Sequence, residues 1–267
     1  KKLDDEFPQI TEAMLSVLYP HFLRPVPSMS VAQLQLAAGT EISEMQALPR
    51  HSQLLSRPVQ GLQVRYRTAY AVDVWPIKIA QAQLEAAERS AFAVTRNDTV
   101  ATLRLRIEAT GQQPLSQLPI QRLRLYLEGE SPLVHALHEL LLNSVASITL
   151  RAPEGEPQVA PLRLPASALQ PVGFAEDEAL LDYDPRSFLG YRLLQEYFVL
   201  PEKFLFVDLT GLDVSRFKHA VEIAIEFNPC GRPERLQRLE QTVSADTFRL
   251  FCTPVVNLFK QQGEPIR

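Results

Sequence analysis

The amino-acid sequence predicts an α+β fold that is rich in antiparallel strands and contains a few packed helices. Apolar and polar residues alternate over 101–109 and again over 122–127, as they do in strands with one buried face. Apolar residues recur at steps of three and four over 3–18 and 133–141, which is the spacing of amphipathic helices. With 267 residues, of which 46% are hydrophobic, the chain can fill the core that such a fold requires.

The first expected element is a helix over residues 3–18. Its apolar face is formed by Leu3, Phe7, Ile10, Met14 and Leu18. Pro20, Pro25 and Pro27 follow, and proline lacks a backbone N–H and restricts the residue before it. We therefore expect an N-terminal helical segment, residues 1–24, that ends where extended backbone begins.

A β-rich α+β domain is expected over residues 25–165. Its predicted strands cover residues 29–36, 62–79, 83–94, 101–109, 123–127 and 145–150. Residues 81–90 are rich in Ala and Glu and fit a helix equally well. Arginines such as Arg104 and Arg124 occupy the polar positions of the alternating strands, which indicates antiparallel strands with one wet, basic face.

The same domain is expected to contain a core helix that starts at Ser131 and Pro132, as N-cap and first-turn proline. One apolar stripe is formed by Leu133, Val134, Leu137, Leu140 and Leu141. Each fully buried Leu or Val contributes roughly 1.5–3 kcal/mol. The stripe should therefore hold this helix on a sheet.

Proline and glycine are frequent over residues 151–171, which indicates a connection between domains. A second α+β domain, incomplete at its C-terminus, is expected over residues 166–267. In it, Asp184 and Pro185 should begin a helix that runs to about residue 198, with Asp184 as its cap. Residues 204–209 and 221–227 have strand patterns.

Residues 172–209 resemble the hallmark segment of the TssF family, also called VasA or ImpG. The matching residues are Glu176, Asp177, Glu178, Leu180, 185–188 (PRSF), 190–198 (GYRLLQEYF) and 201–204 (PEKF). Residues 2–29, 66–77 and 243–267 resemble the same family, whereas residues 80–168 match it loosely. Because TssF proteins extend beyond both ends of this sequence, the chain is expected to be an internal or N-terminal fragment.

The resemblance implies a structural wedge subunit of the type VI secretion system baseplate, which holds and triggers a contractile sheath. It implies as partners TssG, a second TssF copy, TssK, TssE and the VgrG hub. It also implies a cytoplasmic location, docked at the inner-membrane complex through the baseplate. The wedge protein of a related phage-like contractile tail is the nearest alternative.

Composition and motifs favour no reaction centre. A net charge of −4 argues against a general binder of nucleic acid or anionic membrane, and no run of eighteen apolar residues occurs. The ten glycines form no phosphate-binding or nucleophile-elbow motif, so neither an enzyme nor a cofactor site is expected. Cys230 and Cys252 are expected to be buried free thiols.

Two clusters of titratable residues invite a metal site, but each has a simpler interpretation. His135 and His138 lie three positions apart on a predicted helix and could bind a metal with Glu139 or a distant carboxylate, yet a solvated helix face or a subunit contact also explains them. An acidic set is formed by Glu176, Asp177, Glu178, Asp182 and Asp184. Its spacing is not that of a calcium loop, so helix capping or a partner-facing loop is preferred, and no metal is expected.

Aromatic residues are concentrated over residues 174–206, and the helix expected there is apolar on more than one side. Such a helix is either central or shared with a neighbour. The candidate partner-binding residues are Tyr183, Phe188, Tyr191, Arg192, Tyr197 and Phe198. The competing hypothesis is an enzyme or carbohydrate-binding β-domain whose site would gather Asp73, Trp75, His219 and Glu222.

Overall fold

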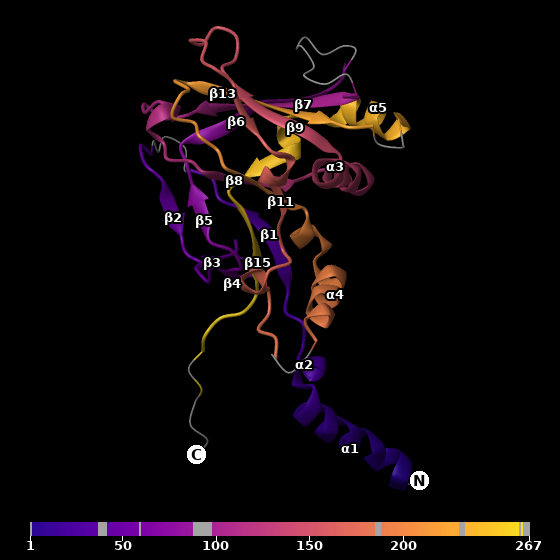
Figure 1. Ribbon diagram of the computed structural model, residues 1–267. Coiled ribbons are helices and arrows are strands. Elements are labelled where there is room, and N and C mark those ends of the chain that lie inside the picture. Colours follow the sequence, from indigo (N-terminus) through magenta and orange to yellow (C-terminus); the bar gives the residue numbers. More distant parts are fainter. Residues whose placement is uncertain are drawn as a thin grey trace.

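The computed structural model describes residues 2–36, 42–58, 60–87, 98–184, 188–229, 233–261 and 263, and, for residues 2–8, 21 and 233, the backbone alone. Within these ranges the chain combines antiparallel sheets with several helices (Figure 1). The predicted α+β class is confirmed.

Two sheets form the upper body of the molecule in Figure 1. The five-stranded sheet has the order β10 (Leu162–Leu164), β9 (Val145–Arg151), β13 (Ala220–Phe227), β7 (Ala101–Ala109), β6 (Ile77–Ala86). The four-stranded sheet has the order β11 (Leu169–Pro171), β12 (Phe206–Thr210), β8 (Arg122–Leu127), β14 (Phe248–Leu250). All their pairings are antiparallel.

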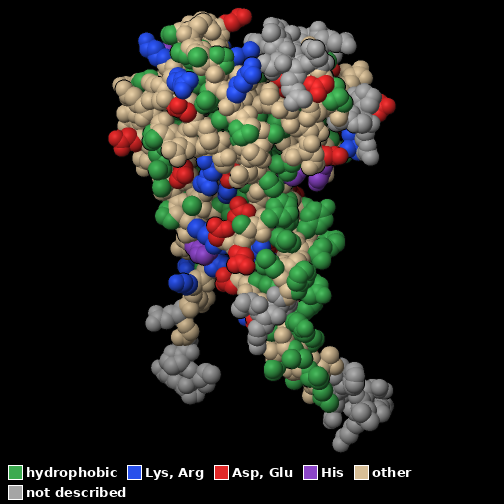
Figure 2. Space-filling view, in the orientation of Figure 1, with side chains coloured by type: hydrophobic (Ala, Val, Ile, Leu, Met, Phe, Trp, Pro, Cys, Tyr) green, Lys and Arg blue, Asp and Glu red, His purple; other side chains and the backbone are tan. Residues whose placement is uncertain are grey.

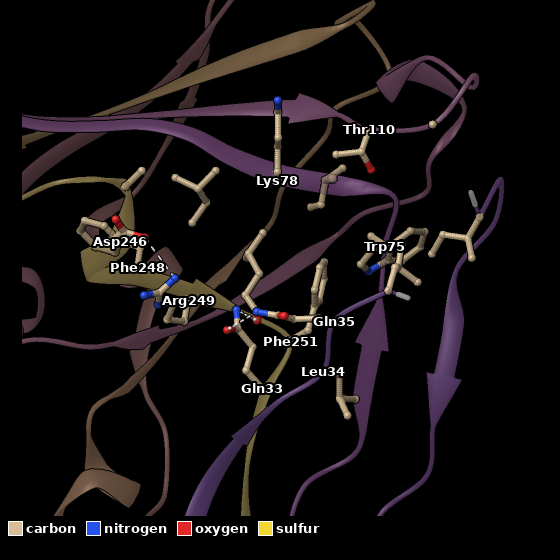
Figure 3. Close-up of a pocket in the computed structure, with 17 residues that line it drawn as sticks. Gln33, Leu34, Gln35, Trp75, Lys78, Thr110, Asp246, Phe248, Arg249 and Phe251 are labelled. Atoms are coloured by element: carbon tan, nitrogen blue, oxygen red, sulfur yellow. Dashed lines mark hydrogen bonds and ion pairs between the residues drawn. The ribbon is translucent and has the colours of Figure 1, made fainter. Parts of the chain in front are cut away.

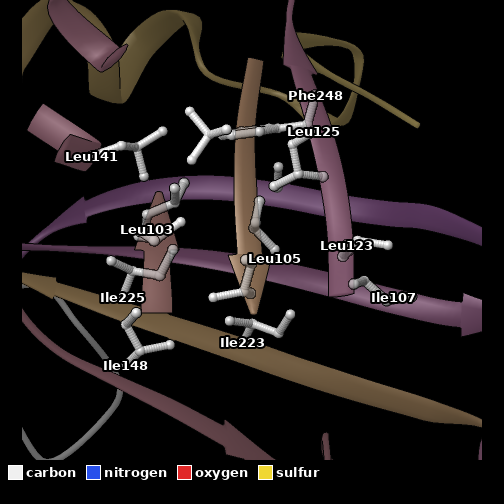
Figure 4. Close-up of a cluster of buried hydrophobic side chains, with 14 of the residues drawn as sticks. Leu103, Leu105, Ile107, Leu123, Leu125, Leu141, Ile148, Ile223, Ile225 and Phe248 are labelled. Atoms are coloured by element: carbon white, nitrogen blue, oxygen red, sulfur yellow. The ribbon is translucent and has the colours of Figure 1, made fainter. Parts of the chain in front are cut away.

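The main hydrophobic core lies between these two sheets and α3 (Ser131–Asn143) (Figure 4). Leu103, Leu105 and Ile107 of β7 point into it together with Leu123 and Leu125 of β8. The alternation in the sequence produces this arrangement, because successive side chains of a strand point to opposite faces. Val134, Leu137, Leu140 and Leu141 of α3 are buried, so the predicted core helix is confirmed.

The outer face of the five-stranded sheet is charge-balanced, and the prediction of a basic face is wrong there. Arg104 lies 2.8 Å from Glu85, and Arg106 lies 2.9 Å from Glu108. The sequence shows only which residues of one strand share a face. The acidic partner on the neighbouring strand depends on the pairing of β6 with β7, which the alternation alone does not give.

A third sheet extends below the other two in Figure 1. Its order is β1 (Met29–Gln33), β15 (Cys252–Val256), β4 (Arg65–Thr68), β3 (Gln53–Leu55), and β2 (Gln46–Leu48) pairs separately with β5 (Val72–Val74). A second core joins Tyr70, Phe206 and Val256 to Leu180 and Leu200. The free thiol of Cys252 is buried there, as expected, whereas Cys230 lies outside the described residues.

The remaining helices are α1 (Lys2–Leu18), α2 (Pro20–Leu23), α4 (Leu189–Val199) and α5 (Pro233–Thr242). The predicted N-terminal helix is confirmed, and Figure 1 shows that it projects away from the sheets. α4 lies beside the third sheet and leads through the 3-10 turn η5 (Pro201–Phe204) into β12. In the part of the chain that the structure describes, no helix is both long and apolar enough to cross a membrane.

Several element boundaries differ from those predicted. The helix expected from Asp184 begins at Leu189, after the undescribed residues 185–187, and Asp184 is not its cap. Glu130, and not Ser131, occupies the N-cap of α3, because Ser131 is already the first residue of the helix and Glu130 is extended. The single strand expected over 62–79 is divided among β4, β5 and the start of β6.

Other strands are shorter than expected. β1 ends at Gln33, and β12 begins at Phe206 because residues 201–204 form a turn. Residues 81–86 belong to β6, so this part of the ambiguous segment is strand, and residues 88–97 lie outside the described residues.

The division into domains 25–165 and 166–267 stays a prediction. The order of strands in the sheets shows how closely the two ranges are connected. β13, from the second range, lies between β7 and β9, and β12 pairs with β8. β15 likewise lies between β1 and β4. Each large sheet therefore contains strands from both ranges, and neither range could complete these sheets by itself.

Candidate protein-interaction surface

α4 carries its apolar residues on the outside. Phe188, at the N-cap of α4, is 72% exposed, and Tyr191 and Phe198 are 52% and 81% exposed. Leu194 is also exposed. These residues lie three or four positions apart, so they share one side of the helix. We call Phe188, Tyr191, Leu194 and Phe198 the aromatic face.

The rings at this helix contact one another and Phe204. Phe188 and Tyr191 form an edge-on pair with ring centroids 5.7 Å apart. Tyr197 contacts Phe198 at the same centroid distance and reaches Phe204 at 6.1 Å. Tyr183 is half-buried on the loop before the helix. Four of the six predicted residues, Phe188, Tyr191, Tyr197 and Phe198, are thus exposed on or at the start of α4.

The apolar surface continues beyond α4. Figure 2 shows hydrophobic side chains gathered along the right side of the lower molecule, from α4 down to α2 and α1. The exposed large apolar residues of α1, of α2 and of the position between them are Ile10, Met14, Val17, Leu18, Tyr19, Phe22 and Leu23. Contiguous exposed apolar surface of this kind is typical of a protein-interaction site.

The inner side of α4 is charged. The residues of α4 that are buried are Arg192 and Glu196, which lie one turn apart. Arg192 is therefore unlike the other predicted partner-binding residues, because it lies 1% exposed beneath the surface. A helix on a protein surface normally has the opposite arrangement, with apolar residues inside and charges outside.

Glu196 forms an ion pair with Lys203 of η5, and both side chains are fully enclosed. Its second oxygen, Oε1, accepts a hydrogen bond from the backbone N–H of Leu180 at 2.8 Å. Burial lowers the pKa of Lys203, and the neighbouring carboxylate of Glu196 opposes that shift. Lysine is rarely buried without a partner, so the ion pair is what allows Lys203 to lie here.

Arg192 holds the loop that precedes α4. Its guanidinium donates hydrogen bonds to the carbonyl of Phe174 at 3.1 Å and to that of Ala175 at 3.2 and 3.1 Å. Gly173, just before these carbonyls, has a φ of +106° and lies close to the backbone of Lys203. A side chain at this position would be strained, which explains the glycine.

The acidic set of the sequence separates into internal and external members. Glu178 accepts hydrogen bonds from the backbone N–H groups of Gly173 at 2.6 Å and Ala175 at 3.2 Å. It also lies 3.4 Å from Arg124 of β8, which binds both carboxylate oxygens of Asp208 on β12. Glu178 is therefore a structural tie between the loop and the sheet, whereas Glu176 and Asp177 are exposed.

The residues of the enzyme hypothesis have separate environments. Asp73 lies 3.9 Å from Arg122, Glu222 is paired with Arg151, and His219 is exposed. Trp75 is almost buried and lines a cavity of about 400 Å³ beside β1 and β14 (Figure 3). Asp246, the carboxylate among the described residues that line this cavity, lies 3.1 Å from Arg249.

The histidine pair also has local partners. His135 is exposed, and its Nδ1 lies 2.6 Å from the carbonyl of Ser131. His138 is half-buried, and burial together with the nearby His135 lowers its pKa. Over the described ranges, no group of three or more His, Cys, Asp or Glu residues has a geometry that could hold a metal ion.

Sequence reasoning did not identify Lys203, Glu196 or the loop contacts of Arg192 as parts of this site. The available signal is weak, since charged residues on a surface helix usually face solvent. Arg192 and Glu196 lie opposite a stripe of four apolar residues, which is also the pattern of an ordinary amphipathic helix. The sequence therefore does not show that the charged side of this helix is the covered one.

Comparisons with known proteins give a consistent result. The family model described as "Type VI secretion system, TssF" matches residues 1–267. The chain is 38% identical over 278 positions to type VI secretion system component TssF1 of Pseudomonas aeruginosa, covering 99% of this chain and 43% of that protein. A chain in the cryo-electron microscopy structure of a TssK-TssF-TssG baseplate subcomplex superposes with a TM-score of 0.77 at 29% identity. That alignment covers 100% of this chain and 48% of the other, so the chain spans about half the length of these relatives.

Proposed function

We propose that this chain, which belongs to the TssF family of the type VI secretion system, is a structural part of a baseplate wedge. Its role would be to hold the contractile sheath in place and to trigger its contraction through changes at subunit interfaces. The family match favours this role over that of a phage-like tail protein. A structural role without catalysis is part of the proposal.

The partners proposed for this chain are TssG and TssK, which are present in the similar baseplate subcomplex. A second TssF copy, TssE and the VgrG hub complete the proposed assembly. The proposed location is the cytoplasmic side of the inner-membrane complex, reached through the baseplate. Two copies in one wedge would meet different neighbours, so one surface would have to accept nonequivalent contacts.

The observation that carries the proposal is the inverted arrangement of α4. Burying one large aromatic or aliphatic side chain contributes roughly 1.5–3 kcal/mol. The aromatic face exposes four such side chains, and aromatic residues are enriched among those that dominate binding energy. We therefore assign the aromatic face to contact with TssG, with Tyr183 and Tyr197 as further candidate contacts.

Binding of the full-length protein to TssG from the same bacterium tests this assignment. Phe198→Asp should weaken the complex by about 30-fold or more, because a dominant interface residue contributes about 2 kcal/mol or more. Leu62→Asp is the matched control, since Leu62 is an exposed apolar residue outside α4 and its replacement should leave affinity within about twofold. Unchanged binding by Phe198→Asp would remove α4 from the interface, and a wild-type protein that forms no complex with TssG would contradict the proposed function.

A further inference from the structure

The inner face of α4 belongs to one continuous polar network. From the helix, Arg192 reaches the carbonyls of the loop over 174–175, and Glu196 binds both the Leu180 N–H and Lys203. From the sheet, Arg124, which is paired with Asp208, reaches Glu178 of the same loop. Residues 173–180 therefore connect α4 to β8 and β12.

We propose that Arg192, Glu196 and Lys203 form a clasp, a set of positioning residues that holds α4 on the 173–180 loop with its aromatic face toward solvent. The inference goes beyond the proposed function by explaining what sets the position of that face, and it rests on the proposed function for the statement that the face binds TssG.

Directionality is the physical reason for a polar clasp. An apolar inner face would compete with the aromatic face for the same contact, because hydrophobic contacts are non-directional. The ion pair and the carbonyl contacts are satisfied together in one orientation of the helix. If α4 turned to bury its aromatic face, the charges of Arg192 and Glu196 would lose these contacts and leave Lys203 enclosed without its counter-charge.

The clasp also determines how much of the protein is ready to bind. A partner that recognises one orientation binds in proportion to the fraction of molecules that hold it, so apparent affinity falls as that fraction falls. Weakening the clasp should therefore lower TssG affinity although Arg192, Glu196 and Lys203 lie beneath the surface.

Amide hydrogen exchange of the free full-length protein tests the clasp without any partner. The variant Glu196→Leu/Lys203→Met removes both charges together and leaves apolar side chains of similar size. We expect α4 amides to exchange about 10-fold to 100-fold faster, because Glu196→Leu leaves the buried N–H of Leu180 without its acceptor and removes the contact that ties α4 to the 173–180 loop. Glu222→Gln, which breaks a charge pair between β9 and β13, is the control and should leave α4 exchange unchanged.

Two further measurements separate this inference from the proposed function. Phe198→Asp should weaken TssG binding by about 30-fold or more while α4 exchange stays at the wild-type rate. If that variant binds normally while the double variant exchanges faster, the clasp stands and the proposed function of the face fails. Unchanged α4 exchange in the double variant overturns the clasp. If the double variant does not fold, Arg192→Met replaces it, because this variant removes only the carbonyl contacts. Faster exchange of α4 amides in Arg192→Met would then support the clasp, and unchanged exchange would overturn it.

Discussion

At the scale of single residues, burial decides what each charged group does. Lys203 is enclosed with Glu196, Arg124 with Asp208 and Glu178, and in both places the charges join separate segments of the chain. Arg124 also lies 5.0 Å from the ring centroid of Tyr70, whose pKa is raised by burial. Removing one member of such a group leaves an unpaired buried charge, which costs more than the pair contributes when intact.

His138 gives a prediction about pH. Its Nε2 is buried with no hydrogen-bond partner within the described ranges, and its pKa is lowered by burial and by His135. The unfolded chain therefore takes up this proton more readily, so the stability contributed by neutral His138 is fully present above pH 6.5 and is lost as pH falls through the lowered pKa. We expect His138→Phe to reduce the fall of the melting temperature between pH 7 and pH 5.

His219→Gln is the control for this measurement, because His219 is exposed on the loop before β13 and should change the pH profile little. A His138→Phe protein whose melting temperature falls as steeply as that of the wild type would show that His138 does not cause the acid sensitivity.

At the scale of elements, the sequence predicts whether a segment is a helix or a strand better than it predicts which face of that element is covered. Alternation gives β7, β8 and β13, and the stripe from Val134 to Leu141 gives α3, because all of these face one core. For α4 the same periodicity shows an apolar side and a charged side but not which of them is covered. The charged side is covered by the loop over 173–180, a contact made by residues up to 18 positions away in the chain.

The two helices can be compared by one substitution. Leu137 of α3 is completely buried, whereas Leu194 of α4 is 55% exposed. Leu137→Ala should lower the free energy of unfolding by about 2–5 kcal/mol, since it removes buried contacts and leaves a cavity. Leu194→Ala should change it by less than about 0.5 kcal/mol, as surface substitutions do.

Urea denaturation of both variants measures the difference. A large loss of stability in Leu194→Ala would mean that the outer side of α4 is covered within the free protein. In that case the aromatic face would be part of the core and could not be the surface that a partner binds.

At the scale of the whole molecule, the chain crosses repeatedly between sheets. β1 pairs with β15 although they lie near opposite ends of the sequence, and β13 inserts between β7 and β9. Composition and spacing predicted a connection over 151–171, and the structure has its short strands β10 and β11 in that range. Long-range pairing of this kind has no local pattern, so the sequence predicted the strands but not their order.

Because strands from both predicted domains share the same sheets, we expect the two domains to unfold together. Native-state hydrogen exchange of the full-length protein in increasing denaturant reports the opening free energy of each strand. Amides of β7, from the range 25–165, should reach the same value as those of β13, from the range 166–267, because the two strands share one sheet and one core. Leu105→Ala in β7 should lower both values equally, since its side chain lies in that shared core. A lower value in β7 alone would show that the two ranges unfold separately, and would restore the boundary near residue 165 as a division between independent units.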